Sequence, residues 1–446
     1  MKLHKSSFVV NLGITNSDGI KKWHYFNTLS RKFISLPDNL KNICSRLNTN
    51  EKFAEFLKRR RWITSFTSYS DEMKDAIELI TTSGVNNRTL NIIFTLTTRC
   101  NLNCNYCFQN NVSRHDASDN VFLSLPSFIR RQIILKPTIK KLRLSLFGGE
   151  PLLMKSRCLN LLQCIKNECS VLSVEFESTI VTNGIGSNPE FWRIATECGL
   201  KSVQITIDGS EKLHDSFRNL NGVGTYRELL SVYSQLSRNF KIGLKYNLNR
   251  KSKKCFSEFL SDIDNNCFNR KNTRIILEVV KPMEYNNLQN YYFQPFSMEA
   301  ANAYLSCAEE SLKFDWQVSL GHVFQPPCMY TQENPSTILI RPDGVVSRCI
   351  SVFNDDSDFT VGNINDPKLS LINHNIKKII EDNAIKCKIN KCPYFPLCMT
   401  GCPSLKKMKL KTIRGILCSY NYLQRMVQGL FLLKNMYPEK FDILYF

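Results

Sequence analysis

Long hydrophobic runs are what this sequence lacks most clearly. No stretch reaches the roughly 18 uncharged apolar residues that a membrane span needs. The basic start, MKLHKSSFVV, has only a short apolar stretch, and no small-residue cleavage site follows it. We therefore expect a cytoplasmic protein with no membrane partner. The 446 residues are enough for two or three domains, each with its own core, and they contain neither internal repeats nor low-complexity tracts.

Acidic residues are scarce relative to basic ones. The chain has 39 Asp and Glu against 59 Lys and Arg, which gives a formal charge of +20. Nucleic acid is the first partner that such a charge suggests, but the basic residues are widely spread and form no arginine-rich tail or recognisable nucleic-acid motif. We therefore expect no nucleic-acid partner. Between Cys387 and Cys418 stand seven Lys or Arg and no acid, which would offset the negative charge of a metal cluster; a solvated basic surface is the alternative.

Cysteine, in contrast, is abundant. Secreted disulfide proteins with many cysteines are mostly short chains, whereas the 18 cysteines here form tight clusters separated by cysteine-poor stretches. This distribution favours metal ligation in a reducing compartment. Eight cysteines lie in ordinary helical or strand patterns, where the simplest interpretation is small apolar filler: Cys44, Cys158, Cys164, Cys169, Cys198, Cys255, Cys267 and Cys307.

Residues 1–86 predict a small module of strands followed by helices. Residues 6–14, 22–29 and 31–37 are short, rich in aromatic and β-branched residues, and separated by turn residues. Three stretches with apolar residues at helical spacing follow, at 37–47, 50–63 and 71–82. The order and size are those of a winged-helix-like module, and GVNNRT then reads as a linker.

Residues 90–281 alternate strand and helix. The predicted strands are residues 90–96, 141–147, 174–181, 202–207, 242–248 and 274–280, with helices between them. Six strands with helical crossovers predict an α/β fold with a parallel sheet, open or curved into a partial (β/α)6 barrel. In such sheets function collects at the carboxyl ends of the strands. TTRCNLNC, GGEP, TNG and DGS each lie just past a strand end, which predicts an enzyme core.

Three cysteines follow the first of these strands in the loop CNLNCNYC. Cys100, Cys104 and Cys107 can hold three corners of a metal site, whereas structural zinc prefers four protein ligands. With Tyr106 as the aromatic residue before the last cysteine, the loop resembles the signature of the radical S-adenosylmethionine (SAM) superfamily. The resemblance implies that the three thiolates, as catalytic and metal-binding residues, hold a [4Fe–4S] cluster whose fourth iron binds SAM.

Three further motifs resemble those of the same superfamily and follow in the expected order. FGGEP resembles the GGE motif that meets the methionine ammonium of SAM, TNG the segment that contacts its ribose, and IDGSEKLHDSFR a stretch that ends in an arginine for its carboxylate. The resemblance covers roughly residues 90–281. It implies that the cofactor-binding residues are Tyr106, Gly148, Gly149, Glu150, Thr182, Asn183, Asp208 and Arg218.

Residues 282–446 resemble a SPASM domain. Seven cysteines lie there, at Cys328, Cys349, Cys387, Cys392, Cys398, Cys402 and Cys418. By the resemblance, Cys328, Cys349 and Cys402 belong to a first auxiliary [4Fe–4S] cluster, and the other four belong to a second. The spacing from Cys387 to Cys392 departs from the usual CxxC, so Cys387 is the least regular ligand. Two zinc sites are the alternative, because tetrahedral thiolate sites also suit zinc.

The resemblance implies a peptide maturase. A radical SAM core with a SPASM domain generates a 5′-deoxyadenosyl radical, and such enzymes mostly modify peptides or proteins, here a ribosomally made precursor that would gain a C–C or thioether crosslink. A low-potential electron donor such as flavodoxin or ferredoxin would be a second partner. Sulfatase maturases typically carry Asp at the position of Ile350, which counts against that activity. The remaining alternatives are an RNA-modifying radical SAM enzyme and a non-catalytic zinc or nucleic-acid-binding protein.

The N-terminal module has the strand and helix order of a leader-peptide recognition element. It carries fourteen Lys or Arg against eight Asp or Glu, a balance that would steer an acidic leader segment toward it. A purely structural cap is the alternative. We expect the leader to pair along the third strand, RKFISLP, because an exposed strand edge can add an extended peptide.

Overall fold

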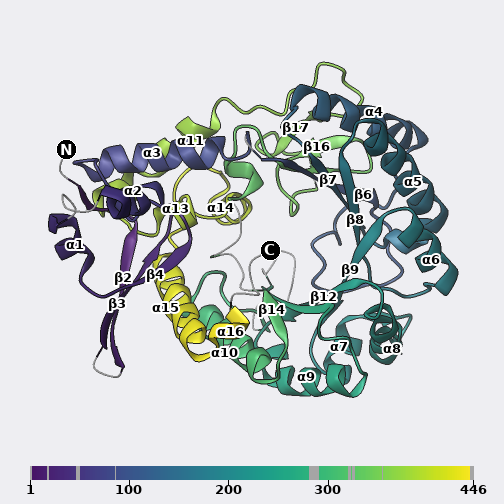
Figure 1. Cartoon of the computed structure of the whole chain (residues 1–446). Helices are drawn as coiled ribbons and strands as arrows, with labels where there is room; N and C mark the ends of the chain where they lie inside the picture. The colour runs from purple at the N-terminus through teal and green to yellow at the C-terminus, as the bar shows by residue number, and fades with distance from the viewer. Residues whose placement is uncertain are drawn as a thin grey trace.

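A curved, mostly parallel sheet is the largest element of the computed structural model, which describes residues 3–17, 20–46, 51–85, 87–280, 291–319, 323, 327–353 and 355–441. The strand order is β14-β13-β12-β9-β8-β7-β6-β15-β16-β17. Helices lie along the outer side of the curve (Figure 1). In the described part of the chain, no helix has both the length and the apolar character of a membrane span.

Six strands of this sheet are those that the sequence predicts. They are β6 (Thr89–Thr97), β7 (Lys141–Gly148), β8 (Glu175–Val181), β9 (Leu200–Ile207), β12 (Lys241–Leu248) and β13 (Thr273–Val279). Each pairs with its neighbours in parallel. The predicted α/β class with a parallel sheet and helical crossovers is therefore confirmed, and the strand bounds differ from the predicted ones by two residues or fewer.

The sheet is larger than the sequence predicts. Four short strands from beyond residue 281 extend it, at β14 (Gln317–Ser319), β15 (Thr337–Ile340), β16 (Val345–Ser347) and β17 (Thr360–Asn363). β14 and β15 join its two edges in parallel, and β16 and β17 continue as an antiparallel extension of β15. Strands of three or four residues are too short for a period-two pattern to stand out. The predicted boundary at 281/282 lies outside the described residues.

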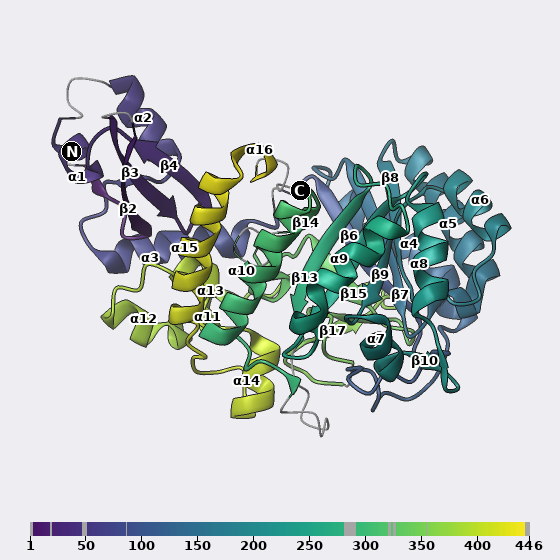
Figure 2. The same cartoon turned by 90° about the horizontal axis from the view of Figure 1, so that it is seen from below.

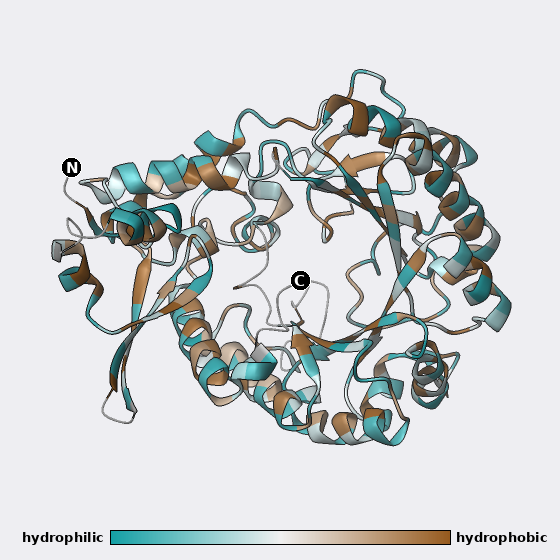
Figure 3. Cartoon of the chain, in the orientation of Figure 1, coloured by the Kyte–Doolittle hydropathy of each residue, from teal (hydrophilic) through white to brown (hydrophobic). Residues whose placement is uncertain are grey.

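The helices that cover the sheet are amphipathic crossovers. They are α4 (Asp119–Leu135), α5 (Lys155–Val171), α6 (Pro189–Glu197), α8 (Tyr226–Leu236), α9 (Phe256–Asn265) and α10 (Met298–Lys313). Ser118, Asn188 and Ser297 cap three of them by accepting a backbone N–H. Figure 3 shows hydrophobic and hydrophilic residues mixed along each helix. Their apolar sides and the sheet form one large core.

The N-terminal residues form the strands and helices that the sequence predicts, in the predicted order. β2 (Val9–Ser17), β3 (Ile20–Asn27) and β4 (Lys32–Leu36) make an antiparallel sheet in which β4 is an edge strand. α1 (Leu40–Arg46), α2 (Glu51–Arg59) and α3 (Tyr69–Thr82) follow. A two-stranded sheet of β1 (His4–Lys5) and β5 (Ile63–Thr64) is added to the predicted elements. The winged-helix assignment stays a prediction.

The N-terminal module packs on the C-terminal third of the chain. The Tyr69 hydroxyl, on α3, donates to the carbonyl oxygen of Cys392 at 2.9 Å, and Thr28 donates to that of Pro393 at 2.6 Å. The His24 and Phe431 rings lie 4.9 Å apart between β3 and α15 (Tyr420–Met436). Figure 2 shows α3 and α15 lying beside the small sheet of β2, β3 and β4. These contacts mean that removing residues 1–86 would expose part of the cysteine-rich region.

Candidate active site

The three clustered cysteines open into a cavity of about 760 Å³ at the carboxyl ends of the strands. Cys100, Cys104 and Cys107 all line it, in the loop that leaves β6. Cys104 is buried, whereas the other two are partly exposed. The structure therefore brings the three predicted ligands together on one wall of one cavity, as a site for a shared inorganic group requires.

Burial opposes the charged form of two of these thiols in the protein alone. It raises the pKa of Cys104 to about 11 and also raises the pKa of Cys100. A cationic group that binds thiolates removes this penalty, because metal binding and thiol deprotonation are coupled. Three soft thiols beside an open space fit an iron–sulfur cluster with one iron left for a ligand.

Two glycines set how closely the cysteine loop can lie against β7. A Cβ at Gly148 would overlap the carbonyl oxygen of Thr97, and one at Gly149 would overlap that of Arg99. Instead, the Gly149 N–H donates to the Thr97 oxygen and the Glu150 N–H to the Arg99 oxygen, both at 2.8 Å. The two glycines of GGE are therefore needed for a close backbone approach, which fixes the start of the cysteine loop.

Glu150 is fully buried and ties three segments together. One carboxylate oxygen accepts from the Leu152 N–H at 2.8 Å and from the Thr182 hydroxyl at 2.5 Å; the other accepts from the Asn183 N–H at 2.7 Å. Burial raises the pKa of Glu150 to about 7, against the opposing effect of these three donors. The lining of the cavity includes Thr182 and Asn183 but not Glu150. Glu150 therefore holds the lining residues Thr182 and Asn183 in place through its hydrogen bonds.

Asn183 connects the end of β8 to the cysteine loop. Its Nδ2 donates to the Asn101 side-chain oxygen at 2.7 Å and lies 3.8 Å from the Cys100 sulfur. Its own Oδ1 accepts from the Ile185 N–H at 3.0 Å. The predicted TNG segment therefore lies against the predicted cluster ligands rather than remote from them.

Tyr106, Asp208 and Arg218 form a second buried network. Arg218 Nε lies 2.6 Å from both the Asp208 carboxylate and the Tyr106 hydroxyl, and that hydroxyl also donates to Asp208. Asn247, on β12, donates to the Tyr106 oxygen at 3.2 Å. Asp208 is fully buried and does not line the cavity, whereas Arg218 and Tyr106 do. The network ties the cysteine loop to the ends of β9 and β12.

Part of the lining of the same cavity comes from the cysteine-rich region. Ile350 and Ser351 follow Cys349, and Ser404 and Lys407 lie on α14 (Pro403–Leu410), directly after Cys402. Ser404 Oγ is 3.2 Å from the Cys402 sulfur. Two of the three cysteines predicted for the first auxiliary cluster are therefore chain neighbours of residues that line this cavity. Cys328 is exposed.

The second predicted set of cysteines gathers at one place. Burial and then the thiols of Cys392, Cys398 and Cys418 raise the pKa of Cys387 to about 12, which shows that the four sulfurs are electrostatic neighbours. Lys406 is also near, and burial lowers its pKa to about 8 against the effect of Cys398, Cys402 and Cys387. The irregular spacing before Cys392 thus does not keep Cys387 away from the other three.

Among the residues that the structure describes, no three His, Cys, Asp or Glu side chains stand close enough to share one metal ion. A [4Fe–4S] cluster attaches each thiolate to a different iron, so its ligands stand further apart than those of a single ion. The ligand sets given above stay predictions.

Sequence reasoning missed the polar residues on the inner face of the sheet. Gln204 and Thr206 on β9, Lys245 and Asn247 on β12, and Glu278 on β13 line the cavity. In sequence, the first two pairs are polar residues at alternate positions of otherwise apolar strands, and this period-two signal was available. Asp356, which contacts Lys407 at 3.3 Å, also lines the cavity, from a loop with no such pattern.

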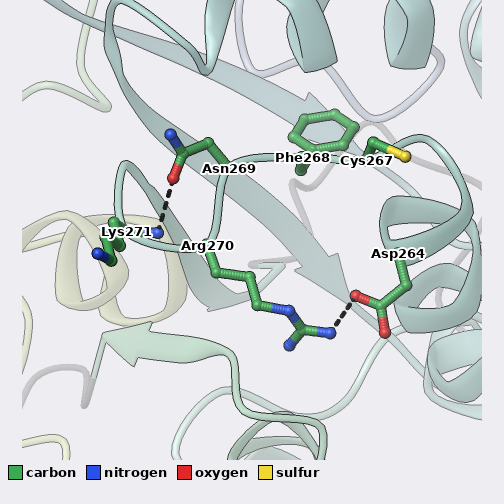
Figure 4. A pocket seen from close by; sticks show the side chains of 6 residues that line it. All are labelled: Asp264, Cys267, Phe268, Asn269, Arg270 and Lys271. Carbon is green, nitrogen blue, oxygen red and sulfur yellow. Dashed lines mark hydrogen bonds and ion pairs between the residues drawn. The ribbon is translucent and has the colours of Figure 1, made fainter.

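A second hollow lies at the opposite edge of the sheet. Asp264, Cys267, Phe268, Asn269, Arg270 and Lys271 line it, between α9 and the amino end of β13 (Figure 4). Arg270 and Asp264 pair at 2.5 Å across it. Because it lies at the amino end of a parallel strand and holds none of the motif residues, it is not the candidate active site.

The strand ends of the parallel sheet present three thiols, two glycines and a buried carboxylate. This set of groups is the one expected for the cofactor site of a radical SAM enzyme. Residues 94–248 match the family model described as the radical SAM superfamily, and the chain contains a radical SAM domain. Enzymes with this domain bind a [4Fe–4S] cluster and SAM, which are the cofactors predicted above.

Curated relatives share parts of the chain. A GTP 3′,8-cyclase of Clostridium perfringens is 31% identical over 152 residues, which are 33% of this chain and 43% of that protein. The matched region therefore spans less than half of that relative. A cysteine-type anaerobic sulfatase-maturating enzyme of Clostridium novyi is 24% identical over 337 residues, or 68% of this chain and 84% of that protein.

Two solved structures share the fold over most of the chain. Native anSMEcpe with bound AdoMet and the Kp18Cys peptide superposes with a TM-score of 0.61 at 17% identity, over 80% of this chain and 99% of that one. Streptococcus suis SuiB bound to the precursor peptide SuiA superposes with a TM-score of 0.53 at 15% identity, over 94% of this chain and 99% of that one. At these identities the similarity concerns the fold alone.

Proposed function

We propose that this protein is a radical SAM peptide maturase that uses SAM to crosslink a ribosomally made precursor peptide, through a C–C or thioether bond. The observation that carries the proposal is the cavity whose lining includes both the thiols of the cysteine loop and the chain neighbours of Cys349 and Cys402. A peptide held in this cavity would lie close to both the radical source and the cysteine-rich region.

The cofactors supply the difficult chemistry, since cleavage of SAM by a reduced [4Fe–4S] cluster provides a radical that removes an unactivated hydrogen. The chain supplies binding and orientation. Cys100, Cys104 and Cys107 would hold the cluster, and Arg218, kept in place by Asp208, would face the carboxylate of SAM. The inner strands then present Lys245 and Glu278 to the substrate.

The auxiliary sets belong to the same proposal. Cys328, Cys349 and Cys402 would hold the first auxiliary cluster, and Cys387, Cys392, Cys398 and Cys418 the second. The basic residues between Cys387 and Cys418 support this assignment, because cations stabilise a negatively charged cluster. The radical SAM domain removes the support for a non-catalytic zinc or nucleic-acid-binding protein.

A leader-binding role for residues 1–86 is also proposed. The SuiB match covers 94% of this chain and therefore leaves about 27 of the 446 residues unmatched. Because 86 residues are about three times that number, most of the module takes part in the match. The SuiB structure is of a complex with a precursor peptide, and β4 is an edge strand with open pairing capacity on one side. Both observations support the leader-binding role.

One experiment tests the crosslinking activity. The protein is reconstituted anaerobically with iron and sulfide, and then incubated with SAM, a reductant and the short peptide encoded beside it. The expected results are 5′-deoxyadenosine and a peptide that is lighter by two hydrogens per crosslink. Formation of 5′-deoxyadenosine with the peptide mass unchanged would contradict this substrate assignment.

Sulfatase maturation is the second candidate, favoured by the 24% identity with the Clostridium novyi enzyme. The structure places Ile350 on the cavity wall, at the position where the sequence pattern of sulfatase maturases carries Asp. Incubation with a cysteine-containing sulfatase peptide separates the two activities, because conversion of a cysteine side chain to an aldehyde removes two hydrogens, exchanges the sulfur for a water oxygen with release of sulfide, and forms no ring within the peptide. Fragmentation of the product therefore decides between them.

A further inference from the structure

A short helix beside the second cysteine set presents two exposed isoleucines. On α12 (Ile385–Ile389), the side chain of Ile385 is 60% exposed and that of Ile389 is 73% exposed. Lys386 and Lys388 on the same helix, and Lys391 just after it, are exposed as well. We name these five residues the α12 face. Figure 2 shows α12 at the outer edge of the molecule, away from the ten-stranded sheet.

The buried side of the same helix carries Cys387. Its side chain is 7% exposed and packs in the core with Phe395 and Met399. The Cys392 N–H donates to the Cys387 carbonyl oxygen at 3.0 Å, so both cysteines belong to the same turn of chain. The α12 face is therefore separated from the second predicted cluster by the thickness of one helix.

Lysines predominate on and just after this helix, and of the acids on α3, which packs against α12, Asp75 pairs with Arg61 and Glu78 with Lys377. Seven Lys or Arg and no acid stand between Cys387 and Cys418. The acids closest in sequence, Glu381 and Asp382, end α11 (Ile376–Asn383), and Asp382 lies 3.8 Å from Arg414. Two exposed isoleucines one turn apart, with three exposed lysines around them, give a surface whose charge complements that of an acidic protein.

We propose that the α12 face is the docking surface for a small, acidic one-electron carrier protein. The proposal rests on the proposed function, because only then does Cys387 hold a group that can accept an electron. One electron would leave the reduced carrier and enter the cluster beneath the face, and no atom or proton would be transferred. Electron-transfer complexes are small and transient and depend on electrostatic steering, and a single short helix with a lysine rim meets that requirement.

Two other occupants fit less well. A second copy of this chain has the same formal charge of +20, so two such faces would repel each other. A nucleic acid would be attracted by the lysines but would gain little from Ile385 and Ile389, which favour a protein surface. Either occupant is a possible outcome of the test and would overturn the proposal.

The test is a binding measurement with an acidic flavodoxin as the probe. Calorimetry is run on the cluster-loaded wild type, on the double variant Lys386→Glu/Lys388→Glu and on Ile389→Ser. The matched control is Lys201→Glu/Lys212→Glu, two exposed lysines on β9 and α7 (Glu211–Phe217). We expect the charge reversal to weaken binding at least about tenfold, Ile389→Ser to weaken it about fivefold, and the control to change it less than about twofold.

Two further measurements separate this proposal from the proposed function. With dithionite as reductant the α12 variants should form 5′-deoxyadenosine at the wild-type rate and keep the wild-type iron content, whereas with reduced flavodoxin they should be slower. If the wild type makes 5′-deoxyadenosine with dithionite but the variants bind flavodoxin as the control does, docking at α12 is wrong. If dithionite yields no 5′-deoxyadenosine from the wild type, the proposed function itself fails. The binding measurement then still tests, on its own, whether flavodoxin docks at the α12 face.

Discussion

Two regions of this molecule hold cysteines in different ways. The loop at the strand ends places three thiols on the wall of a cavity, and its backbone is fixed by glycine contacts and by buried networks around Glu150 and Asp208. The region from Cys387 to Cys418 instead places Cys387 on the short helix α12 and Cys398 at the end of α13 (Phe395–Cys398), and Cys387 packs in an apolar cluster. The first arrangement leaves room for a ligand, whereas in the second Cys387 is buried and Cys418 is exposed.

This difference indicates a division of labour. A site that activates a small molecule needs an open coordination position and pre-positioned polar groups, which are what the strand ends offer. A site that only passes electrons needs neither, but it benefits from nearby cations and a route to the surface. The predictions below test whether the two regions separate in this way.

The largest expected effect is at the strand ends. Cys104→Ala should abolish 5′-deoxyadenosine formation, because two thiolates cannot hold the cluster that binds SAM. Chromatography of reaction mixtures measures this product directly. Cys164→Ala, at an exposed cysteine on α5, is the matched control and should keep full activity. SAM cleavage that survives in the Cys104 variant would remove the basis for the strand-end assignment.

A smaller and different effect is expected in the C-terminal region. Cys398→Ala should lower the iron content by roughly a third, which is one cluster of three, yet leave part of the SAM cleavage. With dithionite as reductant, modified peptide should fall much further than 5′-deoxyadenosine, because only the strand-end thiols are then needed for cleavage. Iron analysis with mass spectrometry of the peptide gives both values, and Cys267→Ala, at an exposed cysteine, is the control. Parallel loss of both products would mean that the two regions do not separate.

The buried ion pair at the strand ends should matter far more for stability than an exposed pair of the same chemistry. Asp208→Asn leaves the buried Arg218 guanidinium without its carboxylate, and we expect a loss of about 3–5 kcal/mol in the free energy of unfolding. Glu197→Gln breaks the Arg193–Glu197 pair, whose side chains are both 63% exposed, and should cost less than about 0.5 kcal/mol. Denaturant unfolding measures both values. Equal losses would show that the network does not hold the loop.

The sequence was sufficient for the long elements and for the motif residues. The six strands with predicted bounds are runs of seven to nine residues, long enough for their composition to mark them, and the cysteine spacing marks the loop. It was not sufficient for β15, which pairs with β6 from about 245 residues away, because such pairing depends on the packing of the whole chain. For the same reason the contact of Asn247 with Tyr106 could not be foreseen: it depends on where the end of β12 falls in the assembled sheet.

His214, on α7, offers a further test of how the strand ends are fixed. The Asp208 N–H donates to His214 Nδ1 at 3.3 Å, so the proton is on Nε2, which faces the Thr225 hydroxyl at 3.3 Å. Protonation of His214 Nδ1 would place its new N–H against the Asp208 N–H, and the two donors would repel each other. Burial, helped by Arg218 and opposed by Asp208 and Asp215, lowers the pKa of His214 to about 4. The native protein therefore holds a neutral imidazole that an unfolded chain would protonate below about pH 6.5.

The smallest predicted effect is the pH dependence that follows. Between about pH 6.5 and 4 the unfolded chain binds the extra proton, so the free energy of unfolding must fall as the pH is lowered, by up to about 3 kcal/mol from this group. His214→Gln should be less stable at pH 7 but should lose less on acidification, so that the two curves converge. His374→Gln, at an exposed histidine of the C-terminal region, should keep the wild-type slope. Because other groups titrate in the same range, the difference between the two variants is what isolates His214, and identical slopes would show that its buried imidazole is not what fixes the end of β9.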